Sequence, residues 1–210
     1  MSEAQRITAV EGRAIPLRGD DIDTDRIIPA RYLRTVSFEG LEEHVFEDDR
    51  STALTGGRVA LHPFDDPRFA GARVLAVHSN FGCGSSREHA TQGISRWGIR
   101  IIVGVSFSDI FFSNAALIGL PCVTASREDV DRLMALVDRQ PDTEIRVDLG
   151  ELTCHAGAFS CAVHLPGAAR DAFVSGSWDT TGMLLERYDE VRAVAARLPY
   201  LNGFSAPPPA

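Results

Sequence analysis

The 210-residue sequence contains few cysteines and no long apolar run, and each shortage excludes a class of protein. Its four cysteines include no C-x-x-C pair, which argues against a zinc site, an iron–sulfur site and a dense disulfide framework in this chain. No apolar run approaches the ~20 residues needed to span a bilayer, and the N-terminus lacks the basic and apolar regions of a signal peptide. We therefore expect a cytoplasmic protein with reduced cysteines.

Basic charge is also in short supply. The chain has 21 lysine and arginine residues against 29 aspartates and glutamates, a formal net charge of -8. This balance argues against a nucleic-acid surface and an anionic membrane patch, although a single site can still bind a small anion through its local charge. The length predicts one domain with an ordinary core, which we place at residues 1–200, followed by a disordered tail at 201–210.

The segment richest in chemistry is R-V-L-A-V-H-S-N-F-G-C-G-S-S-R-E-H-A, residues 73–90. It begins as an apolar strand, passes through a loop with two glycines and continues as a helix. The first turn of a helix has unpaired N–H donors and the positive end of the helix dipole, so this corner attracts anions. Arg87 adds a planar fork suited to a carboxylate or phosphate. The segment predicts a small-anion site, and a catalytic one if a serine there becomes basic.

A purely structural interpretation of the same corner stays open. Ser85-x-x-Glu88 fits a capping box, in which the two side chains satisfy each other's unpaired backbone donors. The corner matches neither common nucleotide loop, because Arg87 stands where a dinucleotide fingerprint has glycine and no Gly-Lys-Ser/Thr follows. A Cys83–His89 pair would offer a thiol nucleophile, but we expect Cys83 to fill a tight loop and His89 to pack on the helix.

An acidic loop precedes this corner in the chain. Residues 19–29 carry four aspartates within six positions, without the central glycine and final glutamate of a calcium loop. The aspartates either cap backbone donors in turns, or one of them, such as Asp25, orients a basic group such as Arg87. In the segment that follows, residues 31–35 combine an aromatic with two arginines, which either line a pocket for a carboxylated ligand or are simply solvated.

Hydrophobic patterns predict strands and helices on both sides of the corner. Strands are expected at Ile7–Val10, Ala14–Leu17, Val74–Val77, Ile99–Val105 and Leu120–Thr124. Helices are expected at Leu41–Phe46, Ser86–Trp97 and Ser108–Ile118, from Ser126 onward, and at Leu184–Leu198. Ile145–Leu149 and Phe159–Leu165 alternate as an antiparallel pair with a turn at His155–Gly157, and residues 47–69 are interpreted as a mobile loop.

Three segments together resemble a known family. Asn80–Ala90 resembles the signature of the swivelling domain of the aconitase superfamily, and more closely that of the separate small subunits of 3-isopropylmalate dehydratases. Asp23–Leu33 and Ser106–Asn114 match two further motifs of those subunits. The resemblance implies an α/β fold, a three-layer β/β/α swivelling domain of the aconitase C-terminal type. It also implies a larger partner subunit that carries a [4Fe–4S] cluster, with no metal or cofactor bound by this chain.

The resemblance also implies roles for individual residues. By motif position, Ser85 is the catalytic base, while Ser86 and Arg87 bind a substrate carboxylate and Arg34 reads the substrate's variable group. Asp25, Glu88 and His89 are candidates for a supporting role around them. A serine needs help to become alkoxide-like, and backbone donors, a helix N-terminus and an adjacent arginine all favour the anion.

The implied reaction is the isomerisation of 2- and 3-isopropylmalate by dehydration and rehydration in leucine biosynthesis, by a hydro-lyase active only with its large subunit. Removing the hydroxyl requires a Lewis acid for which this chain offers no ligand set. Two alternatives stay open. Arg34 could bind a third carboxylate, which would favour homoaconitate or a related methylated diacid. The chain could instead be a non-catalytic, anion-binding regulatory subunit.

Overall fold

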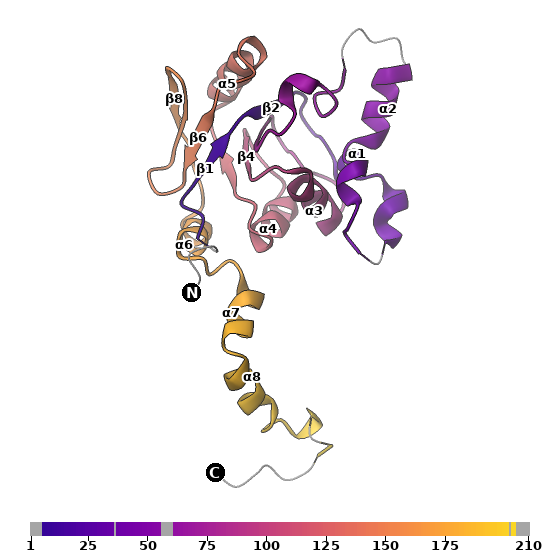
Figure 1. The fold of residues 1–210 in the computed structure, drawn as a ribbon, viewed down its shortest axis with the longest axis vertical. Coiled ribbons are helices and arrows are strands. Elements are labelled where there is room, and N and C mark those ends of the chain that lie inside the picture. Colours follow the sequence, from indigo (N-terminus) through magenta and orange to yellow (C-terminus); the bar gives the residue numbers. More distant parts are fainter. Residues whose placement is uncertain (1–5, 36, 56–60, 202, 205–210) are drawn as a thin grey trace.

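The computed structural model of the chain describes residues 6–35, 37–55, 61–201 and 203–204, except for the side chains of residues 53–55. Two four-stranded sheets and the helices around them form the body of the molecule (Figure 1). Among the described residues, no helix has the length and apolar character needed to cross a bilayer.

The central sheet is parallel and buried. Its strands, in spatial order, are β2 (Ala14–Leu17), β3 (Val74–Val77), β4 (Ile101–Gly104) and β5 (Cys122–Thr124). Every residue of these strands except Thr124 is buried, which explains their uninterrupted apolar runs. The four strands predicted for this region are confirmed, although β4 and β5 are shorter than the apolar runs that predicted them.

The second sheet is antiparallel, with the order β1 (Ala9–Gly12), β6 (Ile145–Asp148), β7 (Thr153–Ala156), β8 (Phe159–Ala162). The predicted direct pairing of the segments at 145–149 and 159–165 is wrong, because β7 lies between them and pairs with both. His155 and Ala156 belong to β7, so the turn is confined to the residues around Gly157. The inward residues of β7 are only a cysteine and an alanine, a weak hydrophobic signal.

Three helices cover the parallel sheet. α3 (Glu88–Trp97) and α4 (Asp109–Leu117) connect successive strands and pack against each other, whereas α5 (Arg127–Arg139) packs on β2 and β3. Figure 1 shows α3 and α4 on one side of the parallel sheet, and α5 with the antiparallel sheet on the other. The predicted three-layer β/β/α architecture is therefore confirmed.

A long excursion between β2 and β3 wraps around α3. It contains α1 (Thr24–Ile27), η2 (Ala30–Arg34), η3 (Leu41–His44), α2 (Glu47–Thr55) and η4 (Pro67–Phe69). The interpretation of residues 47–69 as a loop is wrong for α2, which lacks an apolar stripe and is held to its neighbours by ion pairs from Arg26 and Arg31. Residues 56–60 of that loop lie outside the described residues.

The chain ends in an arm that leaves the body. After α6 (Gly167–Ser175), whose Phe173 is buried, come α7 (Thr180–Glu186), α8 (Tyr188–Ala195) and η5 (Pro199–Leu201). The single helix predicted at 184–198 is therefore broken at Arg187, and neither α7 nor α8 contains a buried residue. We call the described residues 180–201 and 203–204 the C-terminal arm, which projects from the base of α6 in Figure 1. Of the predicted disordered tail, residues 202 and 205–210 lie outside the described residues.

Candidate active site

The predicted anion site lies where the loops after β2, β3 and β4 meet. Backbone bonds continue the strand pairing beyond the sheet: the Gly82 N–H donates to the carbonyl of Ile22 at 2.8 Å, and the Phe81 N–H donates to the carbonyl of Ser106 at 3.1 Å. Isolated bridges join residue 23 to residue 83 and residue 81 to residue 107. The glycine loop is therefore clamped on both sides, as expected for a site at the carboxyl ends of parallel strands.

Two glycines shape this loop for different reasons. Gly82 has a φ of +74°, and a Cβ there would lie 2.2 Å from Cγ of Phe111, so both the backbone conformation and the space require glycine. Gly84 has a φ of +89°, but its nearest neighbour, Cβ of Asp23, would be 3.5 Å away. Gly84 is needed for its conformation alone.

The two serines that follow are free for a ligand. α3 begins at Glu88 with Arg87 as its N-cap and no side-chain capping bond, so the capping box proposed for Ser85 and Glu88 is not formed. Glu88 instead accepts a hydrogen bond from Nε2 of Gln92 at 3.0 Å. Both Ser85 and Ser86 are exposed, and neither hydroxyl is bonded to any described residue. The first-turn N–H groups of α3 therefore keep no side-chain acceptor and can bind an anion.

Arg87, which follows the two serines in the chain, is held in place by an ion pair. Its guanidinium forms an ion pair with Asp25, and its side chain is 14% exposed against 52% for that of Asp25. Nε of Arg87 is buried with no hydrogen-bond partner. An unpaired buried donor costs free energy, so a ligand that reaches it would gain a charge-assisted bond. The acidic loop had two interpretations, and for Asp25 the structure shows the second, in which its carboxylate pairs with Arg87.

The other three aspartates of that loop serve the backbone and neighbouring side chains. Asp23 caps α1, and Asp21 accepts from the side-chain amide of Asn80 at 2.8 Å. Asp20 accepts from the Ser79 N–H at 2.9 Å, and that bond, followed by the one from Arg127, lowers the pKa of the Asp20 carboxyl. In the described part of the chain, no cluster of three or more His, Cys, Asp or Glu side chains is placed to hold a metal ion.

Cys83 and His89 do not form a nucleophilic pair. Burial raises the pKa of the Cys83 thiol, and the nearby carboxylates of Asp23 and Asp21 raise it further, so the reactive thiolate is disfavoured. The His89 ring packs edge-on against Phe38 at 5.0 Å, and its Nε2 is buried without a partner. Both observations agree with the packing roles expected for these two residues.

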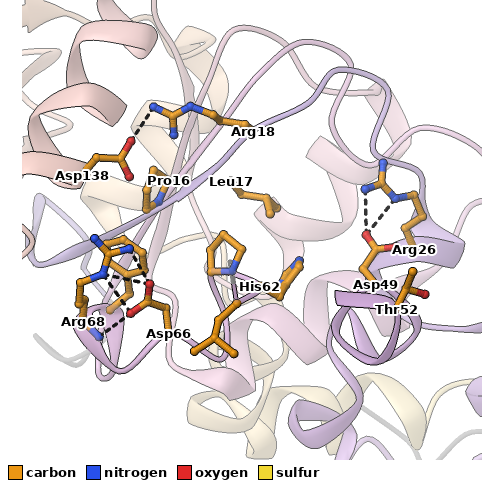
Figure 2. Close-up of a pocket in the computed structure, with 13 residues that line it drawn as sticks. Pro16, Leu17, Arg18, Arg26, Asp49, Thr52, His62, Asp66, Arg68 and Asp138 are labelled. Atoms are coloured by element: carbon orange, nitrogen blue, oxygen red, sulfur yellow. Dashed lines mark hydrogen bonds and ion pairs between the residues drawn. The ribbon is translucent and has the colours of Figure 1, made fainter. Parts of the chain in front are cut away.

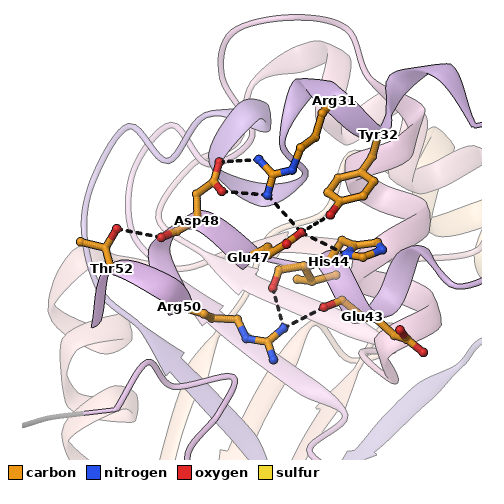
Figure 3. Close-up of polar contacts among 9 residues, drawn as sticks. Arg31, Tyr32, Glu43, His44, Glu47, Asp48, Arg50 and Thr52 are labelled. Atoms are coloured by element: carbon orange, nitrogen blue, oxygen red, sulfur yellow. Dashed lines mark hydrogen bonds and ion pairs between the residues drawn. The ribbon is translucent and has the colours of Figure 1, made fainter. Parts of the chain in front are cut away.

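Among the described residues, no hydrogen bond or ion pair joins Arg34 to the corner. It ends η2, is exposed, and makes no hydrogen bond or ion pair with any residue in the described ranges. Figure 3 shows what fixes the helix that carries it: Arg31 binds Asp48 at 2.8 and 3.0 Å, and the Tyr32 hydroxyl donates to Glu47 at 2.5 Å. These bonds lower the pKa of both carboxyls and raise that of Tyr32.

Sequence reasoning missed two positioning hydroxyls. Thr24 donates to the carbonyl of Ser85 at 3.0 Å, and Ser108 donates to the carbonyl of Gly82 at 2.6 Å while capping α4. Ser108 could have been found from its place at the start of a predicted helix, where a serine commonly caps. Thr24 carries no such signal, because its partner is 61 positions away in the chain.

A cavity of about 540 Å³ lies beside β2, and none of the predicted site residues lines it (Figure 2). Its arginines are already neutralised: Arg18 pairs with Asp138, Arg26 with Asp49 and Arg68 with Asp66, at 2.6 to 2.8 Å. Among the described residues that line it, the cavity therefore offers an anion no unpaired arginine, unlike the corner with its two open serines and the unpaired Nε of Arg87.

One family profile and several known proteins resemble this chain. The family profile described as the aconitase C-terminal domain matches residues 4–128. A 3-isopropylmalate dehydratase small subunit of Synechocystis is 46% identical over 94% of this chain and 96% of its own length. A protein of the same name from Thermus thermophilus is 44% identical over 93% and 96%. A crystal structure of 3-isopropylmalate dehydratase from Methanocaldococcus jannaschii, 26% identical, covers 86% of this chain and 99% of its own with a TM-score of 0.62.

Proposed function

Because the chain belongs to the aconitase C-terminal domain family, and within it to the 3-isopropylmalate dehydratase small subunits, we propose that it supplies one half of a two-chain hydro-lyase active site. The reaction is the interconversion of 2- and 3-isopropylmalate by loss and return of water, through 2-isopropylmaleate, in leucine biosynthesis. The observation that carries this proposal is the start of α3, which has no side-chain cap and where two exposed serines precede an arginine held by an ion pair.

Each residue of the corner has a separate task in this proposal. The Ser86 hydroxyl, the Arg87 guanidinium and the first-turn N–H groups of α3 hold a substrate carboxylate, which fixes the adjacent carbon beside Ser85. Ser85 then accepts the proton from that carbon, and returns it when water is added back. The helix N-terminus and the arginine stabilise the anionic form of the serine, as donors aimed at a developing charge do in other active sites.

The departing hydroxyl is left to the partner chain. The cysteines of this chain do not fit an iron–sulfur cluster. Cys122 and Cys154 are buried, and Cys161 is paired with Cys154 on the neighbouring strand. Cys83 lies apart from them in the glycine loop. We therefore assign the [4Fe–4S] cluster to the large subunit. We place the assembled enzyme in the cytoplasm, where thiols and clusters stay reduced.

The test is turnover of the enzyme assembled from both subunits. Ser85→Ala should lower kcat by about 10³-fold, within the range of one positioned acid–base group, without changing assembly. Ser95→Ala, in the last turn of the same helix, is the matched control and should leave kcat unchanged. Near-normal turnover in Ser85→Ala would contradict the role of the serine, and loss of assembly would show that the variant tests something else.

A second substrate class stays open because the Arg34 guanidinium has no partner among the described residues. A third carboxylate, as in homoaconitate, would bind it. We favour isopropylmalate because the relatives from Synechocystis and Thermus thermophilus are named 3-isopropylmalate dehydratase small subunits. Arg34→Val decides between them: it should spare isopropylmalate turnover, whereas selective loss of activity on a tricarboxylic substrate would favour homoaconitate. Ligand binding by the isolated chain, with no activity alongside any large subunit, would instead indicate a regulatory protein.

A further inference from the structure

The C-terminal arm exposes more large apolar side chains than the rest of the described chain. Eight large apolar side chains of the arm lie open to solvent: Leu184, Leu185, Tyr188, Val191, Val194, Tyr200, Leu201 and Phe204. Leu185 is 66% exposed and Phe204 is 80% exposed. Apolar side chains concentrated in this way on one element mark a surface that a partner covers, whereas isolated exposed ones need no explanation.

α8 has one apolar and one polar side. Tyr188, Val191 and Ala195 recur at three- and four-residue spacing and so share one face. Asp189 and Glu190 fall on the other side, where Glu190 pairs with Arg187 at 2.8 Å. A helix that merely bridges solvent is polar all round, so α8 is built to lay its apolar face against another surface.

The apolar surface of the arm continues towards the candidate active site along α4. At the root of the arm, Leu117, Phe173 and Trp178 line an apolar hollow of about 330 Å³. Leu117 ends α4, and Ile110, also exposed, lies in its first turn. α4 is nine residues and so about 13 Å long, and its start packs against the glycine loop. α4 therefore spans from the glycine loop to the root of the arm and exposes a large apolar residue near each end; Figure 1 shows the arm leaving the body beyond α4 and α6.

Most of the arm lies in a segment that is matched by a relative named as a small subunit. The match with the Synechocystis protein spans 197 of the 210 residues, so at most 13 residues lie outside it. Wherever the match begins, residues 180–195, which include α7 and α8, fall within it. The segment that forms α7 and α8 in this chain is thus matched in a protein named as a small subunit.

We propose that the arm docks in an apolar groove of the large subunit and holds the two chains together. This inference rests on the proposed function, because the chain that completes the active site must face the corner from which the apolar surface extends. A second copy of this chain bound arm to arm would leave the exposed residues of α4 uncovered. In this arrangement the large subunit covers both the arm and the exposed residues of α4, and its contact with the arm lies away from the substrate.

The test titrates a fixed amount of large subunit with the small subunit and follows isopropylmalate turnover. In Tyr188→Ser/Val191→Ser, the concentration of small subunit that gives half-maximal activity should rise about 100-fold, as for loss of two central apolar anchors, while kcat at saturation is unchanged. Asp189→Ser/Glu190→Ser, with two changes on the opposite side of the same helix, should shift it less than 3-fold. Circular dichroism verifies that both variants keep their helices.

Three results would overturn the proposal. An unchanged half-saturating concentration in the apolar variant would remove the arm from the interface. A wild-type small subunit that is a dimer by light scattering, and a monomer in Tyr188→Ser/Val191→Ser, would identify the occupant as a second copy. An equal rise of the half-saturating concentration in the two double variants would mean that the assay reports the stability of the helix and not an apolar contact. Failure of the proposed function looks different: the wild-type pair would co-elute on gel filtration and yet be inactive at every concentration.

Discussion

Adding one methyl group at position 82 should damage the corner more than any other small change in it. The Cβ of alanine would lie 2.2 Å from Cγ and 2.6 Å from Cβ of Phe111, whose own side chain is buried at the start of α4. The ring cannot swing away, because it packs edge-on against Phe81 at 5.1 Å. The glycine loop or α4 must therefore move.

Two costs add in Gly82→Ala. Holding alanine at a φ of +74° costs about 1–2 kcal/mol relative to glycine, and forcing an extra carbon into a packed core costs about 1–3 kcal/mol more. The free energy of unfolding should fall by about 2–5 kcal/mol. Gly84→Ala has the same kind of φ, +89°, but its nearest contact would be 3.5 Å away, so it should lose only the conformational part, about 1–2 kcal/mol.

Urea unfolding of the isolated subunit, followed by circular dichroism, measures both variants. The midpoint should drop further in Gly82→Ala than in Gly84→Ala, with the m-value unchanged. Phe111→Ala should itself cost about 3–5 kcal/mol, but combined with Gly82→Ala it should cost less than the sum, because the ring that causes the clash is gone. Equal midpoints for the two glycine variants, or strict additivity with Phe111→Ala, would refute the steric argument.

Three further predictions concern other contacts of the described chain. Asp25→Asn removes the charged partner of Arg87, so kcat/KM of the assembled enzyme should fall about 10-fold, roughly one charge-assisted hydrogen bond, while the unfolding midpoint of the small subunit barely changes. Because Arg31 and Tyr32 lower the pKa of Glu47 and Asp48, the stability from these carboxylates is present above their unfolded pKa values and is lost as the pH falls below about 4. Arg31→Gln should therefore lose less stability than wild type between pH 7 and pH 3 in urea titrations, and an unchanged acid dependence would contradict this. Cys161 should be the first thiol alkylated by iodoacetamide, because a hydrogen bond from Cys154 lowers its pKa whereas burial raises that of Cys122; mass mapping of the modified peptides checks the order.

The parts of the fold that could be predicted are those in which one residue pattern has one physical cause. Val74–Val77 and the β-branched run at 101–103 are apolar on both faces because the sheet is covered on both sides. α5 showed its apolar stripe and its serine cap in the sequence, and both are present. The glycine–serine–arginine segment could be predicted as a strand-to-helix turn with free donors, and the structure has that turn, because the local pattern alone places the donors there.

The parts that could not be predicted depend on contacts between residues distant in the sequence. α2 is a helix of mostly polar residues held by arginines more than 15 positions away, so no local pattern reveals it. The serine and glutamate at 85 and 88 fit a capping box by spacing, but Thr24 holds the carbonyl of residue 85 and Arg87 becomes the N-cap instead. The exposure of the arm was also hidden, since the same apolar spacing describes a helix packed on its own domain and one packed on another chain.

α4 joins two tight contacts that the rest of the molecule keeps apart. At its start Phe111 presses on Gly82, and just past its end Gly119 leaves no room for a side chain, since a Cβ there would lie 2.5 Å from the indole of Trp178 at the root of the arm. Both close contacts belong to the same nine-residue helix. The distance between the glycine loop that leads to Ser85 and the root of the arm is therefore set by the length of α4.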